Sequence, residues 1–286
     1  SVSVVGHHEG VAAWLLEASG FIAQSPSDGP CGLPADEYDG ALIDLYLDDG
    51  GTQVCALADV LPVATLGEAS RCEERGIWID YHAGVVPEAG PRRFGGLAYV
   101  PLDPRLAAER RARREVRRVL VATGGSARFT EVTARIAEVA SAAFPGAEIV
   151  CPAAAAALAH APVSALPAPY DIVDLAPSVD LAVVGAGMTA YETAGAGIPT
   201  IAVALVENQR VVLEGSRSSG IALAVDGVDR DPVDDIRAAL ADLGDPSART
   251  KLASTATTAI DGQGAARIAS ALLSAWTNPG TTPIGR

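Results

Sequence analysis

The segment from Asp180 to Gln209 constrains the fold more than any other part of this chain. Leu181–Val184 is an unbroken apolar run, too short for a helix and of the right length for a strand buried on both faces. Gly185-Ala186-Gly187 then allows a tight turn and a close approach of the backbone to a ligand. A short helix follows, and Gly197-Ile198-Pro199 is placed to end it before the strand Thr200–Val206. The segment therefore predicts a strand, a glycine turn, a helix and a second, parallel strand.

The start of the predicted helix carries a pattern with two interpretations. Thr189-Ala190-Tyr191-Glu192 has the spacing of a capping box, in which the threonine hydroxyl caps the backbone and the glutamate reaches back to it. The helix N-terminus also carries unsatisfied N–H groups and about half a positive charge, so it favours a phosphate group. Beside a nucleotide, the Glu192 carboxylate can accept hydrogen bonds from two ribose hydroxyls. The spacing alone leaves the capping role and the ribose role of Glu192 equally open.

The composition indicates a folded, strongly acidic protein. Of 286 residues 49% are apolar, which is enough for a sizeable core in one large domain or in two smaller ones. Lysine plus arginine against aspartate plus glutamate gives 21 − 35 = −14. A net charge of this sign disfavours nucleic acids and anionic membranes as partners.

The cysteines and the chain start indicate the compartment and the completeness of the first domain. Cys31, Cys55, Cys72 and Cys151 lie far apart without a C-x-x-C pair, which predicts neither a disulfide framework nor a zinc site. No apolar run reaches transmembrane length and no signal peptide is recognisable, so we expect a cytoplasmic protein. The chain opens without an initiator methionine on Ser1–Val5, which reads as the middle of a sheet. We therefore expect an upstream part of the first domain to be missing.

Strands that alternate with helices predict an α/β architecture with mostly parallel sheets. The predicted strands are 1–5, 21–24, 38–44, 63–66, 76–80, 119–122, 147–150, 181–184, 200–206 and 220–225, and the predicted helices are 11–18, 53–60, 130–143, 232–243, 247–259 and 265–276. Breaks in composition predict an N-terminal α/β domain at 1–100, a linker helix at 101–118, a C-terminal α/β domain at 119–276 and a frayed tail at 277–286.

Arginines crowd the predicted linker helix. Residues 105–118 hold seven arginines. One interpretation is a weak membrane contact with anionic lipid, or a phosphate site. The other is a solvated helix in which Glu109 and Glu115 pair with nearby arginines. We favour the solvated helix, because charge runs usually solvate one face.

Three loops of the second half are predicted to meet. Thr123–Ser126, Gly185–Thr189 and Val206–Gln209 each follow the carboxyl end of a predicted parallel strand. The first two loops can present backbone N–H groups to a diphosphate. Glu207-Asn208-Gln209 adds three polar side chains, either as ligand contacts or as an ordinary polar loop. The G-x-G turn lacks the third glycine of a dinucleotide fingerprint, which argues against a nicotinamide cofactor.

These residues carry a resemblance to a known family. Gly185–Glu192, Gly197-Ile198-Pro199 and Glu207-Asn208-Gln209 together resemble the donor-binding region of GT-B sugar-nucleotide enzymes. The E-N-Q ending is similar to one branch, the UDP-sugar hydrolase of pseudaminic acid synthesis and its spore-coat polysaccharide relatives. Further segments that resemble this branch, in the same order, are Asp39–Tyr46, Gly96–Leu102, Val119–Ser126 and Ile260–Ile268.

The resemblance implies a GT-B-like fold of two Rossmann-like domains facing a cleft, and an enzyme that removes UDP from an amino-sugar nucleotide by attack of water. The setting would be bacterial glycan or specialised-metabolite biosynthesis, with a UDP-sugar as small-molecule partner. No metal or other cofactor is implied, since backbone amides can stabilise the leaving diphosphate. The implied substrate-binding residues are Gly124, Gly125, Ser126, Gly185, Gly187, Met188 and Thr189 around the diphosphate, Glu192 at the ribose, and Glu207, Asn208 and Gln209 at the phosphate or sugar. Asp44 and Tyr46 would border the sugar in catalysis.

The sequence departs from the family pattern at the catalytic loop. The essential histidine of the family lies in a G-x-G-H-x-x-R loop that would precede residue 1. His7 and His8 are candidate substitutes, although Gly10 stands where the arginine of the loop belongs, and the alternative is that both are ordinary loop histidines. Ala127 also replaces the aspartate of the family's G-G-S-D. The alternatives to a hydrolase are therefore a GT-B glycosyltransferase with a UDP-sugar donor and a non-catalytic sugar-nucleotide-binding protein.

Overall fold

The computed structural model describes residues 4–5, 23–24, 40–44, 62–66, 76–83, 93–108, 115–166 and 169–277. The chain forms two compact units. The first contains residues 1–80, 87–94 and 269–286, and the second contains 81–86 and 95–268. Each unit is built on parallel strands, so the predicted α/β class is confirmed. The domain boundaries proposed from the sequence remain a prediction.

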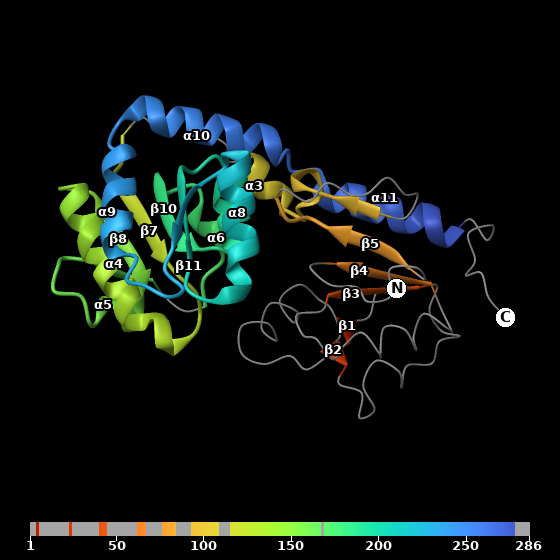
Figure 1. The fold of residues 1–286 in the computed structure, drawn as a ribbon, viewed down its shortest axis with the longest axis horizontal. Coiled ribbons are helices and arrows are strands. Elements are labelled where there is room, and N and C mark those ends of the chain that lie inside the picture. Colours follow the sequence, from red (N-terminus) through yellow and green to blue (C-terminus); the bar gives the residue numbers. More distant parts are fainter. Residues whose placement is uncertain are drawn as a thin grey trace. The chain divides into compact units, whose positions relative to one another are not determined.

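The second unit is organised by a six-stranded parallel sheet (Figure 1). Its strands in chain order are β7 (Arg118–Ala122), β8 (Glu148–Pro152), β9 (Ser164–Leu166), β10 (Leu181–Gly185), β11 (Thr200–Ala204) and β12 (Leu223–Asp226). In space the order is β12-β11-β10-β7-β8-β9, and every neighbouring pair is parallel. The first three strands run outward from β7, and β10 then returns to its other side. This is the strand order of a Rossmann fold, with its switch point between β7 and β10.

The side chains of the central strands point alternately into two apolar cores, one on each face of the sheet. Every residue of β10 and β11 is buried. Side chains along a strand point alternately to the two faces. Leu120, Ala182 and Val184 accordingly belong to one core, while Val119 and Leu181 belong to the other. The continuous apolar runs in the sequence are thus what a sheet covered on both sides requires.

Helices cover both faces of this sheet (Figure 1). The face of Val119 is covered by α4 (Thr130–Ala143) and α9 (Val233–Asp242), with α5 (Ala153–Ala156) beside them. The face of Leu120 is covered by α3 (Pro104–Ala108), α6 (Ile172–Leu175), α7 (Met188–Gly195) and α8 (Arg210–Ser219). Short 3-10 turns precede three elements: η3 (Leu97–Tyr99), η4 (Ala127–Phe129) and η5 (Glu207–Gln209).

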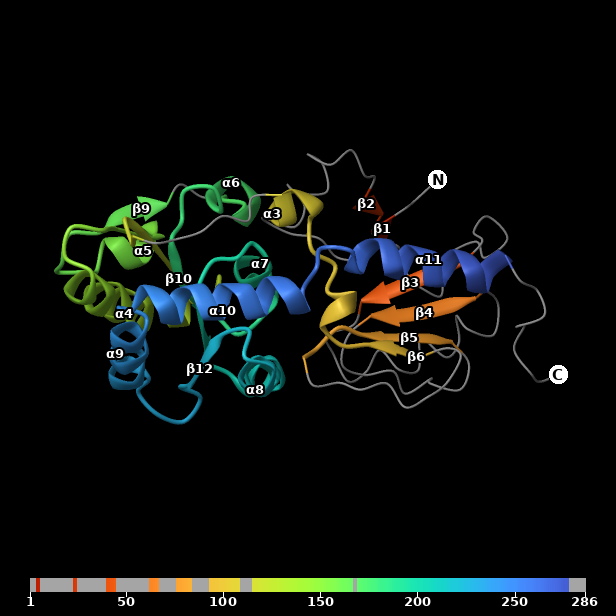
Figure 2. The same ribbon diagram turned by 90° about the horizontal axis from the view of Figure 1, so that it is seen from above.

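Two long helices close the chain. α10 (Pro246–Ala259) packs against α7 and starts at Asp245, whose side chain accepts from the Ser247 N–H (Figure 2). α11 (Gly264–Thr277) begins in the second unit, and its residues from Ala269 onward belong to the first. Both helices were predicted from the sequence to within one residue at each end.

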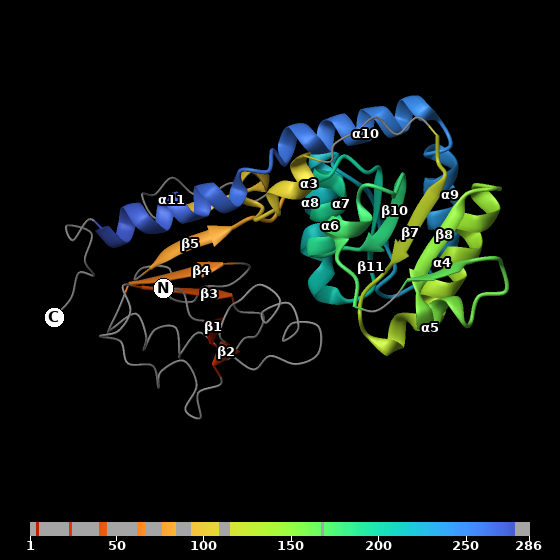
Figure 3. The ribbon, with the colours of Figure 1, turned by 180° about the vertical axis from the view of Figure 1, so that it is seen from behind.

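The first unit contains a four-stranded sheet in the order β3-β4-β5-β6. Its strands are β3 (Ala41–Asp44), β4 (Val63–Leu66), β5 (Ile77–Asp80) and β6 (Arg93–Gly95), and a separate parallel pair is formed by β1 (Val4–Val5) and β2 (Ala23–Gln24). The first three strands of the sheet are parallel and lie side by side in Figure 3. At Gly40, just before β3, a side chain would meet the ring of Trp276. The predicted helices 11–18 and 53–60 and the tail after residue 277 lie outside the described residues.

The helix predicted at 105–118 is wrong at its C-terminal end. α3 covers Pro104–Ala108 among the described residues, but residues 115–117 are not helical and Arg118 opens β7. The reason is tertiary. The Asp180 carboxylate accepts the backbone N–H groups of Arg117 and Arg118 at 3.0 and 3.1 Å. Arg118 also pairs in register with Glu148 of β8. Sheet pairing thus overrides the helical propensity of an arginine-rich run.

Other differences concern short elements. α8 was not predicted, nor were α5, β9 and α6 within the segment rich in proline and alanine. β12 begins at Leu223 rather than at Gly220, because Gly220 has a positive φ of 67° and ends α8. No helix in the described parts of the chain has the length and apolar character of a membrane span.

The contact between α8 and residues 81–83 gives a test of the fold. A side chain at Gly215 would overlap the carbonyl oxygen of Ala83. We expect Gly215→Ala to lower the free energy of unfolding by about 1–3 kcal/mol through overpacking, although alanine is the better helix former by about 1 kcal/mol. Gly125→Ala is the control, because its added methyl group meets nothing within 4 Å. Urea denaturation of both variants measures the difference, and a stabilised Gly215→Ala would contradict the close approach.

Candidate functional site

The candidate site lies at the carboxyl edge of the six-stranded sheet. Because all six strands are parallel, the loops that follow β7, β10 and β11 emerge at the same edge. They are Thr123–Ser126, Gly185–Gly187 and Val206–Gln209. The first two flank the switch point between β7 and β10, where open α/β sheets bind their ligands. The structure therefore brings together the three loops that the sequence predicted to converge.

Glycines shape both loops at the switch point. A side chain at Gly185 would lie 2.7 Å from the carbonyl oxygen of Thr123, so only glycine fits between β10 and β7. Gly124 has a φ of 133°, which also favours glycine. At Gly125 and Gly187 an added side chain would meet nothing within 4 Å. The backbone of these two residues is thus open to close approach by a ligand.

The predicted capping box is wrong, although the helix is where the sequence placed it. Gly187 is the N-cap of α7, no side chain caps the helix, and Thr189 lies inside its first turn. The Thr189 side chain instead acts on Glu192, whose pKa it lowers. At the other end, the N–H groups of Gly197 and Ile198 donate to the carbonyls of Ala194 and Thr193, which is a Schellman motif. The N–H groups of the first turn of α7 are therefore not used by a cap from a side chain.

Glu192 is the group with unusual electrostatics in this region. Burial of its carboxyl group, together with the negative charges of Asp171 and Asp103, raises its pKa from 4.5 to about 7, against the opposing effect of the hydrogen bond with Thr189. Asp171 is the N-cap of α6, where it accepts the Val173 N–H at 2.9 Å, and Asp103 forms a bidentate pair with Arg105. Hydrogen-bond donors from a ligand would stabilise the anionic form of such a partly buried carboxyl group.

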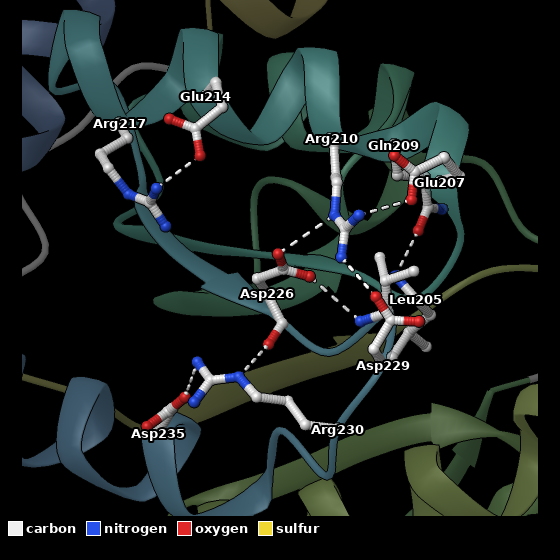
Figure 4. A network of polar contacts seen from close by, with 11 residues as sticks. Leu205, Glu207, Gln209, Arg210, Glu214, Arg217, Asp226, Asp229, Arg230 and Asp235 are labelled. Carbon is white, nitrogen blue, oxygen red and sulfur yellow. Dashed lines mark hydrogen bonds and ion pairs between the residues drawn. The ribbon is translucent and has the colours of Figure 1, made fainter.

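The three polar residues after β11 have different surroundings, and Figure 4 shows two of them, Glu207 and Gln209. The Gln209 side-chain oxygen accepts the backbone N–H of Leu205 at 2.7 Å. Its side-chain nitrogen would lie 3.5 Å from a Cβ at Gly185, beside the glycine turn. The Glu207 carboxylate pairs with Arg210 at 2.6 Å. Asn208 is exposed between them. Gln209 therefore shapes the turn, whereas Glu207 and Asn208 are exposed, and Glu207 is held by its pair with Arg210.

The sequence missed several residues that the structure places around this site. The charges of Asp103 and Asp171 raise the pKa of Glu192. Arg210 forms an ion pair with Glu207 in the turn after β11. The Tyr191 hydroxyl accepts the Ala83 N–H at 3.2 Å from inside the core. A helix prediction at 172–175 would have identified Asp171 as a cap, and one at 210–219 would have drawn attention to the pair of Glu207 and Arg210, which are three residues apart. The contacts of Arg210 with Asp226 and Asp229 and of Tyr191 with Ala83 have no signal in the sequence, because these partners are distant along the chain.

The remaining candidates cannot be placed in the site. Asp44 ends β3 in the first unit. His7, His8 and Tyr46 lie outside the described residues. Within the described ranges, no group of three His, Cys, Asp or Glu side chains is arranged to hold a metal ion.

No family model and no curated protein matches this chain. Solved structures do match it. MurG from Acinetobacter baumannii is 15% identical with a TM-score of 0.65, over 95% of this chain and 90% of that one. UDP-GlcNAc 2-epimerase from Neisseria meningitidis bound to UDP-GlcNAc is 12% identical with a TM-score of 0.59, over 95% and 91%. The spinosyn rhamnosyltransferase SpnG complexed with thymidine diphosphate is 17% identical with a TM-score of 0.51, over 90% and 75%.

These likenesses establish the fold class. The chain has the GT-B-like α/β fold, as the sequence predicted. The finer resemblance to the UDP-sugar hydrolase of pseudaminic acid synthesis stays a prediction from the sequence.

The raised pKa of Glu192 predicts how stability depends on pH. The pKa of Glu192 is higher in the folded protein than in the unfolded chain, so the folded state favours the protonated carboxyl group. The free energy of unfolding is therefore highest below pH 4.5, and it falls as the pH rises to about 7. Over this pH range the free energy of unfolding decreases by about 3 kcal/mol. We expect Glu192→Gln, which cannot ionise, to be more stable than the wild-type protein at pH 8 and similar to it at pH 4.5. Chemical denaturation at both pH values measures the difference, and an equal effect at both would contradict the assignment.

Proposed function

We propose that this protein binds a UDP-sugar at the switch point of its second unit and releases UDP by hydrolysis. The observation that carries this proposal is the Glu192 carboxyl group, which is held one turn inside α7, the helix that starts at the open backbone of Gly187. The names of two solved structures of the same fold support it, since one is bound to UDP-GlcNAc and the other to thymidine diphosphate.

In this proposal the diphosphate is held by the two glycine loops. Backbone N–H groups of Gly124, Gly125 and Ser126 approach it from the side of β7. Gly187, Met188 and Thr189 approach it from the N-terminus of α7, where the helix dipole favours negative charge. Both loops have the open backbone that such an approach needs, because Gly125 and Gly187 have free space where a side chain would be.

Glu192 accepts the ribose hydroxyls in this proposal. A carboxylate at this position is unfavourable without a ligand, because burial and two nearby carboxylates oppose its charge. Two hydroxyl donors would stabilise the ionised form, so binding near pH 7 is coupled to release of a proton. Asn208 adds an exposed amide for the phosphate or the sugar, and Gln209 holds the turn that carries it.

The hydrolysis step needs little from the second unit beyond binding. Water attacks the anomeric carbon, the bond from this carbon to the diphosphate oxygen breaks, and a base takes the proton from the water. Backbone amides and the α7 N-terminus stabilise the negative charge that develops on the departing UDP. The sequence suggests four residues as candidates for the catalytic groups: His7, His8, Asp44 and Tyr46.

A glycosyltransferase is the second candidate, because the matched structures include a rhamnosyltransferase. It would use the same donor site and pass the sugar to an acceptor hydroxyl instead of water. Bacterial glycan or specialised-metabolite biosynthesis is the proposed setting in either case.

UDP binding tests the proposed site. We expect UDP to raise the melting temperature of the wild-type protein and to bind about tenfold more weakly at pH 6 than at pH 8, since only the ionised Glu192 accepts both hydroxyls. Glu192→Ala should weaken binding at pH 8 ten- to a hundredfold, as expected for lost hydrogen bonds to a charged group, and should lose the pH dependence that Glu192 supplies.

Glu214→Ala is the matched control, because Glu214 lies on the exposed side of α8 in a pair with Arg217. Calorimetric titration gives the dissociation constants. A wild-type protein whose melting temperature is unchanged by saturating UDP would show that the site is wrongly assigned.

Hydrolysis is separated from transfer by leaving out the acceptor. We expect candidate UDP-amino sugars, incubated with the protein in buffer alone, to yield UDP at a rate that depends on enzyme concentration. Release of UDP is followed by chromatography. Donor that stays intact until an acceptor sugar is added would identify a transferase instead.

A further inference from the structure

Arg210 joins the two loops that follow β11 and β12. Its guanidinium contacts three carboxylates at once (Figure 4). Nη1 donates to Glu207 at 2.6 Å, Nη2 donates to Asp229 at 2.9 Å, and Nε donates to Asp226 at 3.2 Å. Glu207 belongs to the turn after β11, whereas Asp226 ends β12 and Asp229 follows it. One side chain thus fixes the spacing of two loops on neighbouring strands.

The groups around Arg210 are themselves held in place. The second oxygen of Asp226 accepts the Val228 N–H at 3.1 Å, so this carboxylate bonds to the guanidinium and to its own loop. Gln209, the residue before Arg210, accepts the Leu205 N–H through its side chain. The turn Glu207–Gln209 is therefore fastened through Arg210 on one side and through Gln209 on the other. Asn208 is the residue between these two attachments.

Charge gives the arrangement a second consequence. Three carboxylates surround one guanidinium, and the side chain of Glu207 is 75% exposed while that of Arg210 is only 34% exposed. A single exposed ion pair contributes little, but the planar guanidinium can hold several carboxylates in one fixed geometry. If Arg210 were lost, three negative charges would remain at the carboxyl edge where the proposed diphosphate binds. Their repulsion would oppose an anionic ligand.

We propose that Arg210 is a positioning residue for the nucleoside diphosphate: it keeps Asn208 at the carboxyl edge and holds the charge of Glu207 away from the phosphates. This inference rests on the proposed function, because it assigns the ligand to the same site. Arg210 itself contacts carboxylates and not the ligand. Its role is to set the geometry and the local charge of the turn after β11.

The test compares two arginines of the same helix. Arg217 also forms an ion pair on α8, with Glu214 at 2.5 Å, but contacts neither loop. We expect Arg210→Gln to raise the dissociation constant of UDP about tenfold and Arg217→Gln to change it less than twofold. Binding is measured by calorimetry well below the melting temperature of each variant, so that both are folded.

A second variant separates positioning from charge. Arg210→Gln combined with Glu207→Gln removes the released carboxylate while the loops stay unfastened. We expect the double variant to recover part of the lost affinity, and the single variant to show a stronger gain in affinity with added salt than the wild type. A dissociation constant unchanged by Arg210→Gln, even with a lowered melting temperature, would reduce Arg210 to a structural role and overturn the proposal.

Hydrogen exchange in the ligand-free protein keeps the test independent of the proposed function. We expect faster amide exchange at 205–210 and 226–229 in Arg210→Gln than in the wild type or in Arg217→Gln. Unchanged exchange in these segments would overturn the fastening of the loops. If the exchange changes as expected but the wild-type protein binds no UDP, the proposed function fails while the linkage of the two loops by Arg210 stands.

Discussion

The parallel pairing of β7 with β10 is the constraint on which the rest of the second unit depends. The two strands align from Leu181 opposite Val119 to Val184 opposite Ala122. Asp180 fixes this alignment at its start, because its carboxylate accepts two consecutive backbone N–H groups, those of Arg117 and Arg118. At the other end Gly185 passes so close to Thr123 that a side chain would not fit. The chain runs outward in opposite directions from this pair, which creates the switch point and with it the place for a ligand.

The electrostatic cost of the proposed site is concentrated in one residue. Glu192 is partly buried near Asp171 and Asp103, and its raised pKa means that the ligand-free protein carries an unfavourable carboxylate near neutral pH. Such a group is costly to the fold and useful to a binding site, because hydrogen-bond donors from a ligand restore what burial removes. At the turn after β11, Arg210 pairs with three carboxylates, and in our proposal this pairing keeps their charge from repelling a diphosphate.

Much of the second unit was predictable because its local signals agree with its tertiary packing. The apolar run at Leu181–Val184, the glycine turn and the C-terminal signal at Gly197 each specify a conformation that the sheet also requires. The sequence-based predictions are wrong where local signals and tertiary packing disagree. The arginine-rich run was predicted to be helical through Arg118, but Asp180 and Glu148 draw that residue into the sheet. α8 was missed because its apolar residues form a single short run, Val211-Val212-Leu213, and do not recur at helical spacing along the polar rest of the helix.

The sequence by itself determined the strand, glycine turn and helix on which the proposed site is built, because these depend on residues adjacent in the chain. It also indicated Glu192 and the E-N-Q turn as candidates. Only the tertiary structure decided what those residues do. Thr189 does not cap the helix, because Gly187 already begins it, and its side chain instead lowers the pKa of Glu192. From other elements, the charges of Asp103 and Asp171 raise the pKa of Glu192. Asp226 and Asp229 form ion pairs with Arg210, also from outside its helix. Charges act through space, and the distances that set their strength exist only once the chain is folded.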